Sequence, residues 1–318
     1  MRSKARLIYN PTAGKETFKT QLADVLRILE ESGLEASCHA TCGPGDATQA
    51  AAQAAADGFP FVVACGGDGT VHEVVNGLAS VAQRPVLGII PAGTANDFAR
   101  ALRIPLNILE AARVIAGKTV QPLDLGRIGG DRYFVNIAAC GRLTEITYEV
   151  PSRLKTVLGQ LAYYVKGLER LPGLRPIDLD IRAGDFIYSG KAMLCLITNS
   201  RSVGGFENIA PRASVSDGVL DVLVVKPTNL GDMIRLVGAA LRGDHTNDER
   251  VLYFHARQIE LNSSEDVDLN IDGEYGGRLP RSVEIMPQHL SVIVTEAQSH
   301  IGKSEAGLPN DRVGSTGD

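Results

Sequence analysis

The order of apolar and polar positions changes character once along the chain. From residue 5 to residue 126, short apolar runs alternate with segments of helical spacing, in which Leu22, Val25, Leu26 and Leu29 mark one face. This alternation predicts a parallel sheet with helices on both faces. The predicted strands are ARLIY, LEASCHA, FVVAC and VLGII. The predicted helices are the one that contains the four residues just named, the segment ATQAAAQAAA with Asp46 as its cap, and residues 71–79, 95–102 and 106–116.

From about residue 120 to residue 295, strand-like runs dominate and predict a second, β-rich domain. Two helical stretches, near 153–170 and 229–242, interrupt it. We therefore divide the chain into residues 1–126, 127–296 and a polar tail at 297–318 that we expect to be disordered. The predicted strands are RYFVNIAA, IDLDIRA, FIYSGKAMLCLIT, VLDVLVV, RQIELN, VDLNID and LSVIVT.

Composition narrows the class of protein. The chain has 318 residues, of which 44% are hydrophobic, so it is expected to be globular. No run is long and apolar enough for a membrane span, and the N-terminus lacks a signal-peptide core, so we expect a cytoplasmic protein. A net charge of −5 argues against nucleic-acid binding. The five scattered cysteines do not form a disulfide framework, and Cys38, His39 and Cys42 lack a second cluster that would complete a metal site.

Small, glycine-bearing loops follow all four predicted strands of the first domain. Ligands of parallel sheets bind beyond the carboxyl ends of the strands, so these loops are expected to gather at one site. The need of short turns for glycine explains one such loop well and four together poorly. The loops are NPTAGK at 10–15, TCGPGD at 41–46, GGDGT at 66–70 and PAGTAND at 91–97.

The GGDGT loop has the features of a phosphate site. Backbone N–H groups of a glycine-rich turn at a helix start suit a phosphate, and Asp68 would face a bound Mg²⁺ or a ligand hydroxyl. The Walker A and protein-kinase signatures are absent from the sequence. The dinucleotide-binding fingerprint is also absent, because His72 stands where it needs its third glycine. In the PAGTAND loop, Thr94, Asn96 and Asp97 offer polar groups, although ordinary helix capping explains the last two equally well.

Carboxylates in the second domain suggest two further sites. Asp272 and Glu274 lie two residues apart after an apolar run, and a close carboxylate pair gives one member the raised pKa that a general base needs. An Asp-Gly hairpin turn is a strong alternative reading of the same residues. Asp217 with nearby carbonyls could hold a hard cation, but here the turn reading is favoured.

Residues 151–176 predict a basic amphipathic helix, with Lys166 among its charges. Such a helix lies on an anionic membrane or packs its apolar stripe against the core, and the second reading is slightly favoured.

The motifs NPTAGK, GGDGTVHEVVNG, IIPAGTANDFARAL and LNIDGEYGG occur in one order, together with RLTEITYEVPS, LGQLAYY, SVGGFENIAP and ALRGDH. From residue 5 to about residue 295, the chain thereby resembles the soluble bacterial diacylglycerol kinases, relatives of the sphingosine kinases, and in particular the Gram-positive type. The resemblance implies an α/β nucleotide-binding domain and a C-terminal β-sandwich, with the active site in the cleft between them. It also implies ATP as donor, diacylglycerol as acceptor, phosphatidic acid as product, Mg²⁺ and a homodimer.

The same resemblance implies roles for particular positions. It implies nucleotide contacts at Asn10, Thr41, Thr94 and Asp97; phosphate binding at Gly66, Gly67, Asp68, Gly69 and Thr70, with Glu73 nearby; a structural Mg²⁺ on Asp217 and the carbonyls of Ser214 and Val219; and a general base at Asp272 or, second, Glu274.

His72 stands where relatives often have Asn and is expected to tune the loop without removing its function. A lipid acceptor requires transient docking on the inner face of the membrane, to which Lys15 and Lys166 would contribute.

Three other functions remain open on the sequence. An NAD kinase would use the same phosphate loop with a soluble acceptor. A kinase for sphingoid bases or ceramide would differ only in the lipid alcohol. A non-catalytic nucleotide or lipid sensor would bind ATP without turnover.

Overall fold

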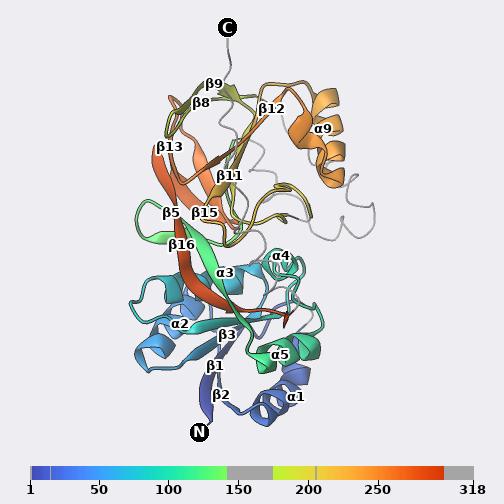
Figure 1. Cartoon of the computed structure of the whole chain (residues 1–318), viewed down its shortest axis with the longest axis vertical. Coiled ribbons are helices and arrows are strands. Elements are labelled where there is room, and N and C mark those ends of the chain that lie inside the picture. The colour runs from blue at the N-terminus through green and yellow to red at the C-terminus, as the bar shows by residue number, and fades with distance from the viewer. Residues whose placement is uncertain (1, 15, 142–174, 205, 297–318) are drawn as a thin grey trace.

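The computed structural model describes residues 2–14, 16–141, 175–204 and 206–296, and Figure 1 shows them as a lower α/β part and an upper β-rich part. The lower part contains four parallel strands in the order β2-β1-β3-β4. They are β1 (Ser3–Tyr9), β2 (Leu34–Ala40), β3 (Phe61–Gly66) and β4 (Val86–Pro91).

Helices cover both faces of this sheet, as the sequence predicted. Helix α1 packs against α5, and α2 packs against α3. Their apolar side chains form one core with side chains of the sheet, including Leu7, Val63 and Ile89. The helices are α1 (Thr17–Glu31), α2 (Asp46–Ala56), α3 (Asp68–Ala79), α4 (Asp97–Ala101) and α5 (Ile108–Gly117).

The last strand, β16 (Arg281–Ile293), connects the two parts. Its first half pairs with β13 (Gln258–Asn262), and Val292 lies opposite Leu87 of the parallel strand β4. Strand β5 (Val120–Ile128) runs antiparallel to β16 over most of its length, with an irregularity in the register between Met286 and Leu290. A single ten-stranded sheet therefore extends through both parts, as Figure 1 shows for β5 and β16.

The upper part is the predicted antiparallel β-sandwich. A six-stranded sheet in the order β12-β11-β10-β7-β14-β15 packs against the upper half of the ten-stranded sheet, and their inner faces form a second core. Helix α9 (Leu230–Arg242) covers the outer face of the six-stranded sheet. The remaining elements are β6 (Arg132–Phe134), β7 (Ile137–Cys140), β8 (Ile177–Ala183), β9 (Phe186–Ala192), β10 (Leu194–Thr198), β11 (Leu220–Val225), the 3₁₀ turn η2 (His245–Asn247), β12 (Val251–Ala256), β14 (Asp268–Ile271) and β15 (Glu274–Arg278).

Several local predictions were wrong or incomplete. The run FIYSGKAMLCLIT is two strands, β9 and β10, in different sheets, and RYFVNIAA divides into β6 and β7. The sequence pattern missed β5, which contains Pro122, a residue that weakens a strand prediction, and it also missed β12 and β15. Asp46 does not cap α2, because its carboxylate accepts a hydrogen bond from the backbone N–H of Cys42.

Part of the predictions falls outside the described residues. These are the amphipathic helix near 153–170, both docking lysines, Lys15 and Lys166, and the tail at 297–318. In the part of the chain that the structure covers, no helix is long and apolar enough to cross a membrane.

Candidate active site

Glycines allow the strand-end loops to touch one another. A methyl group on Gly93 would lie 2.4 Å from the Cα of Gly67, and one on Gly14 would lie 2.4 Å from the carbonyl oxygen of Ala92. Gly67 itself has φ −88°, so close approach rather than a left-handed backbone explains the glycine there. The first, third and fourth loops are thus in backbone contact at one edge of the sheet.

Gly69 differs from these packed glycines. It is exposed in the first turn of α3, and a methyl group placed on it would meet no atom within 4 Å. The N-terminus of a helix carries partial positive charge and free backbone N–H groups, which favour an anion. The space beside Gly69 is therefore suited to a phosphate group.

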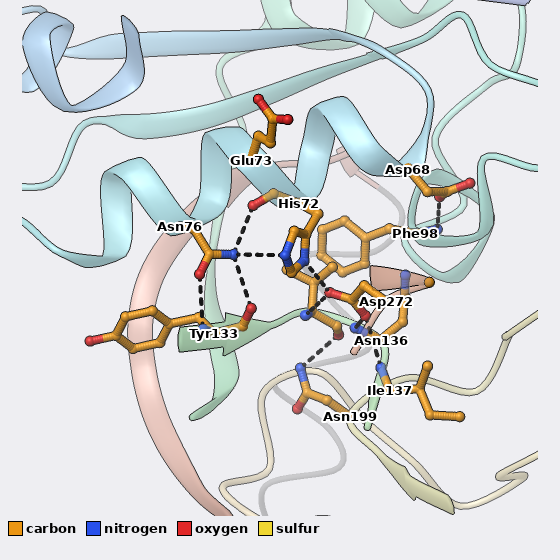
Figure 2. A network of polar contacts seen from close by, with 12 residues as sticks. Asp68, His72, Glu73, Asn76, Phe98, Tyr133, Asn136, Ile137, Asn199 and Asp272 are labelled. Atoms are coloured by element: carbon orange, nitrogen blue, oxygen red, sulfur yellow. Dashed lines mark hydrogen bonds and ion pairs between the residues drawn. The ribbon is translucent and has the colours of Figure 1, made fainter. Parts of the chain in front are cut away.

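Asp68 lies between the beginnings of two helices. It is the first residue of α3, and its Oδ1 accepts a hydrogen bond of 3.3 Å from the backbone N–H of Phe98 in α4 (Figure 2). Burial, followed by the negative charge of Asp97, raises the pKa of Asp68 to about 6, and Asp272 adds to this shift. Three carboxylates from different segments therefore concentrate negative charge here, which a divalent cation would offset.

Asp97 joins the two parts of the molecule. Its Oδ2 accepts a 2.7 Å hydrogen bond from the backbone N–H of Gly204, which lies between β10 and β11. Asn96 fixes the preceding loop, because its side chain exchanges hydrogen bonds of 2.9 and 3.0 Å with the backbone of Gly93. Helix capping by the Asn96 side chain, one of two equally favoured readings of the sequence, is therefore not observed.

Asp272 occupies a hairpin turn and is buried as well. Asp272 and Gly273 connect β14 to β15 with φ values of +50° and +97°, the signs that a type I′ turn requires. The Asp272 side chain is only 2% exposed. It accepts backbone hydrogen bonds from three consecutive residues, at 2.8 Å from Val135, 2.9 Å from Asn136 and 3.0 Å from Ile137.

The turn also separates the two carboxylates that the sequence paired. Glu274 is the first residue of β15 and is exposed, whereas Asp272 is enclosed by backbone N–H groups. Hydrogen bonds from three consecutive backbone N–H groups hold the Asp272 carboxylate in one orientation. Of the two, Asp272 is therefore the carboxylate with a fixed position.

His72 and Asn76 complete a network that the sequence did not reveal. His72 Nδ1 lies 3.0 Å from Asp272 Oδ2, and Asn76 forms two hydrogen bonds with the backbone of Tyr133, of 2.9 and 3.0 Å (Figure 2). The available signal was their spacing of four residues, which places both on one face of α3. Helix α3 is thereby attached to the segment that holds Asp272.

The other residues predicted to contact the nucleotide form hydrogen bonds with nearby backbone or side-chain groups, or are exposed. Glu73 accepts hydrogen bonds from the backbone N–H groups of Gly45 and Ala47 at the start of α2, and Figure 2 shows it pointing away from the Asp272 network. Asn10 Oδ1 accepts from the N–H and the hydroxyl of Thr12 at 2.9 Å, Thr41 is partly buried beside β1, and Thr94 is exposed. None of these positions contradicts a nucleotide contact, and for all of them it stays a prediction.

The proposed structural Mg²⁺ site fits the chemistry of its surroundings. Partial desolvation of the carboxyl group, followed by the negative charges of Asp221 and Asp124, raises the pKa of Asp217 to about 6, although the residue as a whole is exposed. Asp221 Oδ2 is buried without a hydrogen-bond partner in the described structure. In the same part of the chain, no three His, Cys, Asp or Glu side chains form a metal cluster, so a cation on Asp217 would need carbonyl oxygens such as those of Ser214 and Val219.

Comparison with known proteins places the chain in a family. Residues 4–128 match the diacylglycerol kinase catalytic domain, and residues 145–294 match the YegS C-terminal NAD kinase beta sandwich-like domain. The chain is 50% identical over 297 residues to a diacylglycerol kinase of Bacillus subtilis (strain 168), which covers 93% of this chain and 98% of the relative. It is 44% identical over 292 residues to a diacylglycerol kinase of Staphylococcus saprophyticus, with 92% and 95% covered.

The fold agrees with these similarities. A crystal structure of a diacylglycerol kinase from Bacillus anthracis str. Sterne superimposes with a TM-score of 0.79 at 30% sequence identity, covering 93% of this chain and 98% of the other. The match extends over both the α/β part and the sandwich. The resemblance seen in the sequence motifs is thus confirmed, and the chain belongs to the diacylglycerol kinase family.

Proposed function

We propose that this protein transfers the γ-phosphoryl group of ATP to the free hydroxyl of diacylglycerol, giving phosphatidic acid and ADP. The observation that carries the proposal is the meeting of two carboxylates from different parts of the chain. The negative charge of Asp272 in the sandwich contributes to the raised pKa of Asp68 at the phosphate loop, so the two carboxylates lie near each other. A donor site and a proton acceptor are thereby brought together, as phosphoryl transfer requires.

The loops of the α/β part would hold the nucleotide. The open first turn of α3 beside Gly69 suits the ATP phosphates, and Asp68 with Asp97 suits the Mg²⁺ that accompanies them. When bound, Mg²⁺ neutralises charge that develops on the phosphate oxygens. A second, structural Mg²⁺ would be held by Asp217 with the carbonyls of Ser214 and Val219.

Asp272 is the proposed general base. The acceptor oxygen attacks the γ-phosphorus, the bond from that phosphorus to the bridging oxygen of ADP breaks, and the hydroxyl proton passes to Asp272. Each of its oxygens has two partners: Oδ1 accepts from two backbone N–H groups, whereas Oδ2 accepts from Val135 N–H and contacts the side chain of His72. We assign the acceptor proton to Oδ2, because one of its two partners is a side chain and not the backbone.

The choice of acceptor rests on the relatives. The relatives named above are diacylglycerol kinases and match more than nine-tenths of the chain. The likeness to NAD kinases is limited to the C-terminal sandwich, whose domain family is named NAD kinase beta sandwich-like. Other lipid alcohols differ from diacylglycerol outside the reacting hydroxyl, so they are tested as competitors.

The deciding experiment is transfer of label from γ-labelled ATP in mixed micelles with anionic lipid and Mg²⁺. Diacylglycerol, a sphingoid base and ceramide are offered separately, and NAD⁺ is offered in solution. Label in phosphatidic acid supports the proposal. Label in NADP⁺ or in another lipid phosphate would assign a different acceptor to the same site, and ATP binding without any transfer would favour a sensor.

Access to a lipid requires contact with a membrane surface, and we propose transient docking on its inner face through basic residues including Lys15 and Lys166. Binding to anionic vesicles should weaken with salt and with removal of these two charges. Binding that responds to neither would contradict the docking proposal. A homodimer, proposed from the family resemblance, is tested by sedimentation of the full chain.

A further inference from the structure

A buried hydrogen bond connects the phosphate-loop helix to the carboxylate of the second domain. His72 and Asp272 are 200 positions apart, their side chains are 9% and 2% exposed, and Nδ1 lies 3.0 Å from Oδ2 (Figure 2). Among the described residues, His72 supplies the one side-chain donor to Asp272, since its other three donors are backbone groups. The His72 side chain therefore restrains Asp272 in addition to the three backbone N–H groups.

The network also fixes which nitrogen of His72 carries the hydrogen. Asn76 Nδ2 points to the carbonyl oxygens of His72 and Tyr133, at 2.9 and 3.0 Å, and its Oδ1 accepts from the N–H of Tyr133. The amide orientation is thus set by the backbone, and it directs the NH₂ group towards His72 Nε2 at 3.4 Å. Both NH₂ hydrogens are directed at those two carbonyl oxygens, so the contact with Nε2 does not define the tautomer. Because a carboxylate only accepts, Nδ1 carries the hydrogen that is donated to Asp272.

This arrangement excludes His72 as the proton acceptor of the reaction. A base in an Asp–His pair uses the nitrogen that faces the substrate. Here the free nitrogen, Nε2, faces Asn76 inside α3, and the histidine is almost fully buried. The remaining role is to control the carboxylate.

We infer that His72 is a positioning residue that holds Asp272 Oδ2 in line for the acceptor hydroxyl and couples the phosphate loop to the sandwich. The inference rests on the proposed function. Without the Nδ1–H donor, Oδ1 keeps its two backbone bonds but Oδ2 keeps only the one from Val135, so the orientation of Oδ2 is less restrained. Because a misplaced reacting group lowers the rate of the chemical step, the loss should fall on kcat rather than on nucleotide binding.

Three substitutions separate a donated hydrogen bond from simple packing. His72→Asn keeps a nitrogen donor one bond from Cγ, as in Nδ1, whereas His72→Gln moves the donor one carbon further, and His72→Leu fills space without a donor. Steady-state kinetics for ATP and diacylglycerol are measured in mixed micelles, and thermal unfolding is recorded for each variant. We expect His72→Asn to keep kcat within about 3-fold, and His72→Gln and His72→Leu to lose about 10-fold or more, with KM for ATP changed by less than about 3-fold.

A readout without turnover tests the bond itself. In protein labelled with ¹⁵N-histidine, the His72 signals should report hydrogen on Nδ1, and Asp272→Asn should shift them. An unchanged kcat in His72→Leu, or equal losses in the Asn and Leu variants, would overturn the inference while leaving the kinase function intact. A parent protein that transfers phosphate to no acceptor would instead overturn the proposed function, together with the catalytic meaning of the contact.

Discussion

Gly93 and Gly67 bring the backbones of two loops into direct contact, because any side chain on Gly93 would lie within 2.4 Å of the Cα of Gly67. Gly69, two residues further along the same loop, has open space instead. The GGDGT motif thus contains glycines with two different purposes. Gly67 permits packing between loops, and Gly69 has open space beside it, which we propose a phosphate group occupies.

Substitution by alanine should have different effects at Gly93, which packs against a neighbouring loop, and at Gly69, which has open space beside it. Gly93→Ala should lower the thermal unfolding temperature, because the contacting backbone cannot move without separating the loops. Gly69→Ala should leave stability unchanged or raise it by up to about 1 kcal/mol, since alanine is the better helix former, yet it should raise KM for ATP at least several-fold. Thermal unfolding and ATP titrations of both variants measure these two effects. A Gly69→Ala protein with normal ATP affinity would place the phosphates elsewhere.

Asp272→Asn should keep ATP binding and lose nearly all turnover. An amide directs an NH₂ group at backbone N–H groups that the carboxylate had satisfied, so a stability loss of about 1–3 kcal/mol is also expected. Nucleotide titration, single-turnover transfer and thermal unfolding measure the three effects. Glu274→Gln is the matched comparison, because Glu274 is exposed in the following strand. If Glu274→Gln abolishes turnover and Asp272→Asn retains it, the assignment of the base is reversed.

Asp68 should make the protein less stable above pH 6. Its folded-state pKa of about 6 exceeds the ordinary 3.8, so the folded state binds the proton more tightly than the unfolded state does. Stability from this group therefore falls as pH rises from about 4 to about 6 and then stays low. Asp68→Asn should raise the free energy of unfolding by about 1–2 kcal/mol at pH 7.5, after allowance for solvent screening, and by little at pH 4. Equal shifts at both pH values would contradict this origin.

Substitution of Glu73 should lower the stability of the fold more than it changes the affinity for ATP. Its carboxylate accepts two backbone bonds at the start of α2, so Glu73→Gln should cost about 1 kcal/mol of stability, as loss of a helix cap does. KM for ATP should change by less than about 3-fold, because the side chain points away from the Asp272 network. A large rise in KM without loss of stability would assign Glu73 to the nucleotide.

Mg²⁺ should stabilise the folded protein through Asp217. Cation binding to the folded state alone raises the unfolding temperature with concentration. The shift in MgCl₂ without nucleotide should be present in the parent and absent in Asp217→Asn, as followed by calorimetry. A shift of equal size in both proteins would place the cation elsewhere.

The sequence predicted the parallel half of the fold well, because the alternation of strands and helices there is local and periodic. Prediction was poorer in the sandwich, where β9 and β10 are adjacent in the chain yet belong to different sheets. Which sheet a strand joins depends on partners far away in the chain. The ten-stranded sheet is the clearest case, since β16 closes it by pairing with β5 and β4 from the first half of the sequence.

The same distinction holds for the site. By itself the sequence indicated the glycine-rich loops at the strand ends, offered the Asp-Gly turn at Asp272 as one of two readings, and identified the family, because glycine spacing and turn chemistry are local properties. Only the tertiary structure decided that Asp272 is buried and held by three backbone N–H groups, that Glu73 supports α2, and that His72 reaches across to the second domain. Burial and hydrogen bonding between distant residues depend on how the sheets pack, and that information is not present in any one segment of the chain.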